Sequence, residues 1–320
     1  MWYYNNKKEK ILKSIDTLPH IPVLLNEVIK GFNNISNGNF IDCTLGYGGH
    51  SYSMLKNYPN INLIGIDRDD EALNFSKKRL TQFQDRVTLL KGSFSEKLNE
   101  IDFNTVCGLL ADFGVSSLQL DKTDRGFRFD SKHLDMRMDQ NAKFSAKDIV
   151  NTYPQYELER IFREYGEVKE SKRVANAIVK YRENKSIESN IELSNIITNI
   201  VRKSGKIHPA TLYFQAIRIE VNSELEEINK LLDILELKQP KGAIVALITF
   251  HSLEDRLVKK RFKKWSKKCT CPQDIMRCVC GNNNNLGVEL NKKPIIATNE
   301  EIKQNPRSRS AKLRLFKFKG

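Results

Sequence analysis

Two motifs early in the chain carry residue types that could bind an adenosine group. The first is the glycine-rich segment Asp42–His50, and the second is Asp67, which ends the apolar run Leu63–Asp67. Glycine lets the backbone approach a ligand closely, and an acidic side chain about 20 residues later could accept hydrogen bonds from both ribose hydroxyls. The combination predicts an adenosyl ligand, either NAD or S-adenosylmethionine.

Both motifs also have a plainer interpretation. The glycines could simply form a tight turn, and their spacing differs from the G-x-G-x-x-G dinucleotide fingerprint. Asp67 could cap the helix that follows it, a role that Asp69 could serve equally well. Taken singly, neither motif decides between a ligand site and a structural turn.

Two later motifs could complete such a site. Phe94, in the segment Gly92–Phe94, could pack on an adenine face or be an ordinary core residue. Asp112 could accept hydrogen bonds from an exocyclic amino group and so align its nitrogen with a methyl donor. Enzymes that methylate amino groups usually have prolines after such an acid, whereas this chain has Phe113 and Gly114.

Alternating strands and helices must position these motifs. Each motif follows a short apolar segment typical of a strand, and helical segments lie between them, as in βαβ units. We therefore expect a doubly wound parallel sheet with the motifs at the carboxyl ends of its strands, where open α/β sheets bind ligands. The predicted strands are Phe40–Asp42, Asn62–Asp67, Arg86–Lys91, Val106–Ala111, Gly242–Phe250 and Leu313–Phe318, and the main helices between and after them are Tyr47–Tyr58, Asp69–Phe83, Thr211–Leu237 and His251–Lys268.

The strand pattern is interrupted in the middle of the chain. Residues 119–148 are polar and irregular, and residues 157–203 are helical, with Leu193, Ile196 and Ile200 at helical spacing. We interpret this region as a helical insertion in the α/β domain. The predicted parts are an N-terminal extension (1–19), a first α/β part (20–124), a helical insertion for substrate recognition (125–208) and a second α/β part with a basic C-terminus (209–320).

Composition excludes several classes of protein. The chain has 320 residues, 40% of them hydrophobic and 29% charged, which is typical of a globular protein rather than a disordered one. Its longest apolar runs, such as Ala243–Phe250, are far shorter than the roughly 20 residues that span a bilayer. Met1–Leu18 is polar and does not resemble a secretory signal. We expect a cytoplasmic protein without a membrane partner.

The net charge of +14 is concentrated in two segments. Arg256–Lys268 contains eight basic residues interleaved with Phe262 and Trp265, and Arg307–Lys319 contains six. Clustered cations with interleaved aromatic rings predict a polyanionic partner, with nucleic acid as the default. A solvated lysine-rich surface is the plainer alternative.

Several polar side chains have two competing interpretations. Arg125, Arg128 and Arg137 could contact RNA phosphates, or they could pair with the aspartates around them and order the loop. His251 follows a predicted strand and could position a base at the ligand edge. We expect Ser252 to cap the next helix.

The six cysteines are too few for a disulfide scaffold. Cys43 and Cys107 lie in apolar runs and are predicted core residues. The other four cysteines are clustered and could supply the four ligands of one tetrahedral zinc ion, but their C-x-C spacing is tighter than the usual C-x₂-C. We therefore favour reduced surface thiols or an adventitious metal site, and we assign no metal ligand among Cys269, Cys271, Cys278 and Cys280. A bound metal would be expected to fix the basic loop rather than take part in chemistry.

Seven separated segments, taken in order, make the chain resemble the RsmH (MraW) family of bacterial ribosomal RNA methyltransferases. The resemblance runs from about His20 to the C-terminus, so it covers nearly the whole chain. The segments that carry it are His20–Leu24, Cys43–His50, Ala111–Ser117, Arg125–Phe129, Leu134–Met138, Phe250–Arg256 and Asn305–Ser310.

The resemblance implies a fold, a reaction and a set of site residues. The fold would be a class I, Rossmann-like methyltransferase domain with an inserted helical substrate-binding domain. The reaction would transfer a methyl group from S-adenosylmethionine to N4 of a decoding-site cytidine of 16S rRNA, cytidine 1402 in the standard ribosomal numbering. The substrate would be the small ribosomal subunit or a late precursor, and the enzyme a monomer or homodimer. The implied cofactor contacts are Gly48, Gly49, His50, Asp67, Phe94, Asp112 and Gln119, with Asp112 also the implied catalytic residue beside the transferred methyl.

Two other functions stay open at this point. A nicotinamide-dependent oxidoreductase would share the glycine turn and Asp67, although the G-x-G-x-x-G fingerprint is missing. A non-enzymatic RNA-binding assembly factor could retain the fold without its activity. The complete set of cofactor positions argues against the second alternative.

Overall fold

A computed structural model describes residues 21–35, 37–116, 119–120, 122–202, 208–272, 274 and 277–320. The predicted N-terminal extension, residues 1–19, lies outside the described residues. The chain divides into two compact units, one formed by Met1–Gly114 with Ile228–Gly320 and the other by Val115–Glu227. The second unit interrupts the first in sequence and extends beyond the predicted insertion (125–208) at both ends.

The first unit contains one sheet with strand order β3-β2-β1-β4-β5-β8-β6, and β7 pairs with β8. Strands β1 to β5 are parallel, and β8 runs antiparallel to β5. This mainly parallel, doubly wound sheet confirms the predicted Rossmann-like α/β fold of the class I methyltransferase type. The strands are β1 (Gly38–Asp42), β2 (Ile61–Asp67), β3 (Val87–Lys91), β4 (Val106–Asp112), β5 (Ile244–Thr249), β6 (Gly287–Glu289), β7 (Ile295–Ile296) and β8 (Lys312–Phe318).

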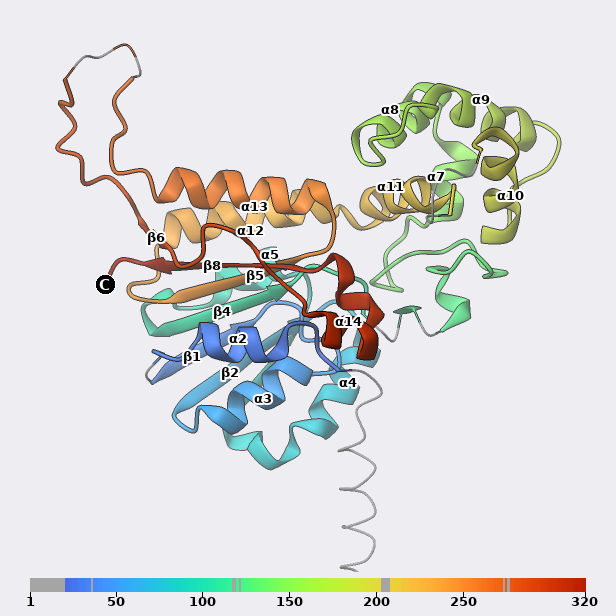
Figure 1. The fold of residues 1–320 in the computed structure, drawn as a ribbon. Helices are drawn as coiled ribbons and strands as arrows, with labels where there is room; N and C mark the ends of the chain where they lie inside the picture. The colour runs from blue at the N-terminus through green and yellow to red at the C-terminus, as the bar shows by residue number, and fades with distance from the viewer. Residues whose placement is uncertain are drawn as a thin grey trace, which may run out of the picture. The chain divides into compact units, whose positions relative to one another are not determined.

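Helices cover both faces of this sheet, as Figure 1 shows. Successive strand side chains point to opposite faces, so Leu109 and Ala111 belong to one core cluster and Leu110 to another. The first cluster includes Leu235 and Phe262 from two of the covering helices. Burial on both faces explains why β4 and β5 are apolar almost throughout. The helices are α2 (Leu25–Gly31), α3 (Gly49–Asn57), α4 (Asp70–Arg79), α5 (Phe94–Lys97), α12 (Glu224–Lys238), α13 (Ser252–Trp265) and α14 (Asn299–Gln304), with 3₁₀ turns η1 (Thr81–Arg86), η2 (Leu98–Glu100), η3 (Phe103–Thr105) and η5 (Pro306–Ser310).

The second unit contains helices and irregular segments but no strand among its described residues, and it has a separate core. Ser145 and Ser189 each form a capping box at the start of a helix, which satisfies backbone donors that the helix itself leaves unpaired. Leu158, Ile161 and Phe162 are fully buried in its core. Its elements are η4 (Thr123–Arg125), α7 (Ala146–Thr152), α8 (Gln155–Glu164), α9 (Ser171–Arg182), α10 (Asn190–Ile200), α11 (Thr211–Asn222) and the first turn of α12.

The prediction of one continuous helix over Thr211–Leu237 is wrong. The helix breaks at Ser223, which has a left-handed φ of 51°. The buried Asn222 side chain fixes this break, since it accepts a hydrogen bond from the backbone of Met138 and donates one to Met136 O, both 2.8 Å. The break separates α11 from α12, and hydrophobic periodicity cannot show it because both helices keep their apolar side.

Within the part of the chain that the structure describes, no helix combines the length and apolar character needed to cross a bilayer.

Candidate active site

The loop after β1 is built on glycines for steric reasons. Gly46 and Gly48 have positive φ values of 51° and 68°, which side chains disfavour. A Cβ on Gly49 would lie 2.4 Å from Cγ of Pro22, so no larger residue fits there without displacing that proline. Ser76 braces the loop from α4, because its hydroxyl donates to Gly46 O at 2.7 Å. The loop is therefore held in one conformation at the carboxyl end of β1.

Asp67, at the end of β2, is joined to this loop. Its Oδ2 accepts a hydrogen bond from Gly46 N at 2.7 Å, and its Oδ1 accepts one from Asp69 N at 2.9 Å. Asp69 is the residue that caps α4, through Glu71 N, so the capping interpretation of Asp67 is wrong. A carboxylate oxygen has more than one acceptor site, so both oxygens of Asp67 can still accept from a ligand hydroxyl.

Helix α3 begins at Gly49, directly after the glycine loop, and no side chain caps its N-terminus. Unpaired backbone N–H groups and the helix dipole favour an anionic group there. His50 is buried, and its Nε2 lies 2.9 Å from Val23 O. The ring therefore anchors the segment before α2 and belongs to the frame of the loop.

Asp112 ends β4 next to the loop. Its backbone N–H donates to Thr44 Oγ1 at 2.6 Å, and Thr44 N donates to Asp42 Oδ1 at 3.2 Å. Asp42 also accepts from the Ser51 hydroxyl at 2.6 Å. Among the described residues, Oδ1 of Asp112 is buried and has no hydrogen-bond partner. Orphaned buried oxygens are rare and point to a missing ligand donor.

The acidity of Asp112 is strongly perturbed. Burial and, to a smaller extent, the negative charges of Asp42 and Glu254 together raise its pKa to about 8. Burial also raises the pKa of Asp42 to about 6, against the lowering effect of its hydrogen bonds from Ser51 and Thr44. A perturbed carboxyl at the ligand edge of an α/β sheet is typical of a functional group.

The end of β5 lies next to Asp112, because Asp112 is paired with Ile248. Here His251, rather than the predicted Ser252, is the N-cap of α13. Glu254 completes the turn: its Oε2 accepts from Phe250 N at 2.7 Å and from His251 N at 3.2 Å. His251 Nε2 lies 3.1 Å from Glu254 Oε1, and both side chains are nearly inaccessible. Glu254 therefore takes the role at the third helical position that the prediction gave to Asp255, and Asp255 pairs with Arg314 instead.

The structure brings six of the seven predicted cofactor residues to one edge of the first unit's sheet: Gly48, Gly49, His50, Asp67, Phe94 and Asp112. Phe94 opens α5 and is mostly buried, 6.1 Å from the Phe113 ring and 5.9 Å from the Arg68 guanidinium. Gln119 belongs to the second unit, where its Oε1 accepts a hydrogen bond from Ser116 N at 3.0 Å. Sequence reasoning missed Thr44 and Glu254, although both lie inside the quoted motifs.

The aromatic residues that alternate with cations in the sequence of α13 do not share the exposed surface of the helix with them. Phe262 and Trp265 are each 1% exposed and belong to the core. They pack on Phe316 of β8, so they cannot stack on a base. Phe262 and Trp265 are three residues apart and so lie on the same, buried side of the helix, whereas the lysines lie on its exposed side. Arg314 is also buried and pairs with Asp255 at 2.7 Å, so the C-terminal cations are partly structural.

The arginines of the polar loop make structural contacts in the second unit. Arg125 is 2% exposed, and its Nη2 donates to Met138 O at 3.0 Å. Arg137 pairs with Asp135, and Arg128 pairs with Asp130. These contacts agree with the interpretation that the arginines order the loop, rather than with the interpretation that they contact RNA phosphates.

Comparison with known proteins gives consistent matches over nearly the whole chain. A model of the MraW methylase family matches residues 17–319. A protein of Sulfurovum sp., named ribosomal RNA small subunit methyltransferase H, is 59% identical over 301 residues, covering 94% of this chain and 98% of its own. Proteins with the same name from Nitratiruptor sp. and Campylobacter jejuni are 55% and 51% identical, each over 302 residues and 94% of this chain, with 99% and 97% of their own length covered.

Proposed function

The chain belongs to the MraW methylase family, and from that premise we propose that it methylates N4 of a decoding-site cytidine in 16S rRNA. The methyl donor is S-adenosylmethionine. The relatives named as small-subunit ribosomal RNA methyltransferases support the substrate class. The observation that carries the proposal is the buried, unpartnered Oδ1 of Asp112 beside the glycine loop and Asp67.

The residues at this edge suit S-adenosylmethionine. Asp67 can accept hydrogen bonds from the ribose hydroxyls while it holds Gly46 N and Asp69 N. The uncapped start of α3 offers N–H groups to the carboxylate of the methionine part. Phe94 would contact the adenine, and the family resemblance also implies a contact from Gln119. When bound, the cofactor supplies an electrophilic methyl group on a sulfonium cation.

Asp112 would act on the target amino group. In the free protein its raised pKa keeps it mostly protonated near neutral pH. A positive charge held beside it favours the ionised form, since opposite charges lower a carboxyl pKa. Ionised Oδ1 would then accept a hydrogen bond from the N4 amino group and hold its nitrogen in line for transfer. Glu254 would be a positioning residue, which fixes the turn after β5.

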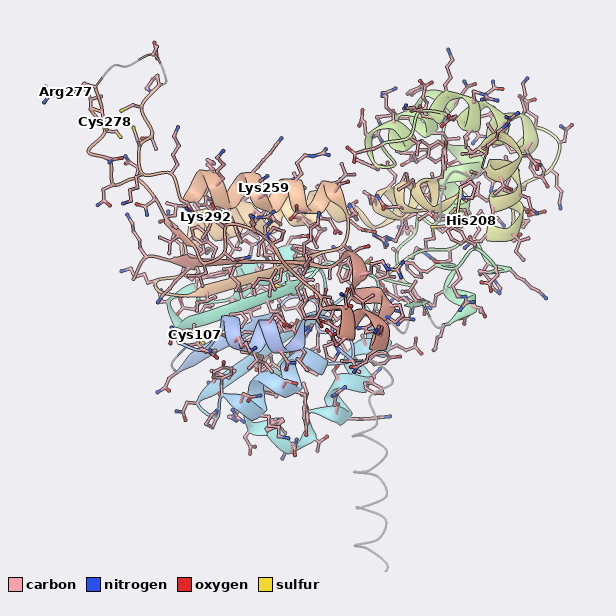
Figure 2. The ribbon with its side chains drawn as sticks, viewed as in Figure 1. Cys107, His208, Lys259, Arg277, Cys278 and Lys292 are labelled. Atoms are coloured by element: carbon pink, nitrogen blue, oxygen red, sulfur yellow. The ribbon has the colours of Figure 1, made fainter. Side chains whose placement is uncertain are left out.

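An exposed basic surface on α13 supports an RNA partner. Lys259, Lys260 and Lys263 project from the outer side of this helix, and Figure 2 labels Lys259 there. Such cations bind phosphates without reading sequence, so they would position the RNA. The target base would have to leave its stack to reach Asp112. The helical unit would contribute the remaining substrate contacts, within a small subunit or late precursor in the cytoplasm.

The experiment uses S-adenosylmethionine with a deuterated methyl group and small ribosomal subunits from a strain that lacks this modification. After digestion to nucleosides, mass spectrometry should find the label in N4-methylcytidine. Label in another nucleoside, or none with active cofactor binding, would contradict the proposal. Calorimetry with NADH as a second ligand separates the oxidoreductase alternative, for which we expect no binding.

A further inference from the structure

A loop between α13 and β6 brings four cysteines together. It leaves α13 after Trp265 and returns to β6 at Gly287, and Figure 1 shows it extending beyond the end of α13. Two cysteines lie on each arm. All four sulfur atoms, those of Cys269, Cys271, Cys278 and Cys280, lie within 4.8 Å of one another.

The spacing of these sulfurs is that of metal ligands. Cys269 and Cys278 are 3.6 Å apart, Cys278 and Cys280 are 3.6 Å apart, and Cys280 and Cys269 are 3.7 Å apart. A disulfide would need about 2.05 Å. Sulfurs that bind one zinc ion at about 2.3 Å in a tetrahedron stand roughly 3.8 Å apart along its edges. The observed separations match that edge.

Backbone donors on each arm face sulfurs of the other arm. Thr270 N donates to Cys280 Sγ at 3.4 Å, and Val279 N donates to Cys271 Sγ at 3.4 Å. Hydrogen bonds of this kind orient metal ligands and stabilise the negative charge on thiolate sulfur. Each arm thus donates one backbone hydrogen bond to a sulfur of the other arm, and the thiols of both arms face the space between them.

Hydrophobic packing does not account for this convergence. None of the described residues between 266 and 284 is buried, and Val279 is 77% exposed. Buried thiols behave as small apolar core residues, but these thiols lie in a loop without a core. The remaining anchors are at its base, where Leu286 N donates to Trp265 O at 2.7 Å.

We propose that Cys269, Cys271, Cys278 and Cys280 bind one Zn²⁺ in a closed, four-sulfur site that joins the two arms of the loop. Four protein ligands leave no open position, so the ion would be structural. Four thiolates and one Zn²⁺ carry a net charge of −2, and Lys267, Lys268 and Arg277, which lie next to the cysteines in the sequence, would offset it. Sequence spacing alone favoured free thiols, and the distances between the sulfurs reverse that expectation.

Elemental analysis of the purified full-length chain tests the site. We expect about one zinc per chain for the wild type and for Cys107→Ser, which removes a half-buried thiol outside the loop. The zinc content of Cys278→Ser should fall below about a tenth of an equivalent per chain. Circular dichroism checks that this variant keeps its fold, which we expect because none of the described residues from Cys269 to Gly281 belongs to either core.

A second measurement replaces zinc with Co²⁺. Four-sulfur tetrahedral cobalt should give thiolate charge-transfer bands and intense visible absorption, both lost in Cys278→Ser and kept in Cys107→Ser. A wild-type chain that takes up no zinc, keeps four freely reacting thiols in excess zinc, or binds iron instead would overturn the proposal. These readouts do not depend on methyl transfer, so they are independent of the proposed function.

Discussion

The backbone N–H of Asp112 donates a 2.6 Å hydrogen bond to the side-chain oxygen of Thr44, which ties the end of β4 to the glycine loop after β1. The two residues are 68 positions apart in the chain. One hydroxyl therefore fixes the carboxyl that would act on the substrate relative to the loop that would hold the cofactor.

Replacing Thr44 by Val keeps the branched shape and removes this acceptor. The Asp112 N–H then loses its partner, which should cost about 1–3 kcal/mol of unfolding free energy. We expect a lower melting temperature and a larger fall in kcat than in cofactor affinity, since Asp112 shifts. Thr88→Val, at an exposed position on β3, is the matched control. Equal kcat values for the two variants would refute the link.

Asp67→Asn tests the ribose contact. Asn keeps one acceptor oxygen and replaces the other by an NH₂ donor, so it cannot accept from Gly46 N, Asp69 N and the ribose hydroxyls together as the carboxylate does. We expect S-adenosylmethionine binding to weaken by about 10- to 100-fold, the loss of one or two hydrogen bonds to a charged group. Asp67→Ala should abolish binding in calorimetry. Asp85→Asn, at an exposed site, should bind normally, and an unchanged affinity in Asp67→Ala would remove Asp67 from the site.

Asp112→Asn should separate activity from stability. The carboxyl has an ordinary pKa of 3.8 when unfolded and about 8 when folded. Between these values the folded protein holds a proton that the unfolded chain has lost, so this group's contribution to stability falls as pH rises from about 4 to 8. Asn does not titrate, so the variant avoids this loss.

We therefore expect Asp112→Asn to lose methyl transfer yet to gain about 1–2 kcal/mol over the wild type at pH 8, after allowance for the partial exposure of the residue. At pH 5 the two proteins should be nearly equally stable. Denaturant unfolding at both pH values measures the difference. A gain that is larger at pH 5 than at pH 8 would mean that Asp112 is not protonated in the folded protein.

Ser223→Gly should stabilise the break between α11 and α12. Ser223 holds a φ of 51°, a conformation that costs an L-residue roughly 1–2 kcal/mol and costs glycine little. Part of this gain is offset by the greater freedom of glycine in the unfolded chain, so we expect a net gain below about 1 kcal/mol. Ser223→Val should lower the melting temperature instead. The opposite order of the two variants would show that the break is not strained.

The sequence allowed the centre of the sheet to be predicted because burial on both faces makes β4 and β5 nearly continuous apolar runs. Strands β1 to β5 and β8 follow their predicted segments within about two residues. The short strands β6 and β7 were missed, since Gly287–Glu289 and Ile295–Ile296 are too short to show any periodicity. The break at Ser223 was also missed, because it depends on contacts that Asn222 makes with distant backbone.

The candidate site could be predicted as a set of motifs at the ends of strands, but the hydrogen bonds and charge interactions within it could not. Residue types alone left open whether Asp67 or Asp69 caps α4, and the structure gives that role to Asp69. The charge on Asp112 depends on its burial and on Asp42 and Glu254, which come from β1 and α13, far apart in sequence. Convergence of this kind is set by tertiary structure and leaves no local signal.

A crystal structure with bound S-adenosylhomocysteine is the most direct test of the central claim. The account predicts ribose hydroxyls on Asp67 and the sulfur facing Oδ1 of Asp112, with room between them for one methyl group and one amine. A ligand bound elsewhere, or a sulfur turned away from Asp112, would contradict it.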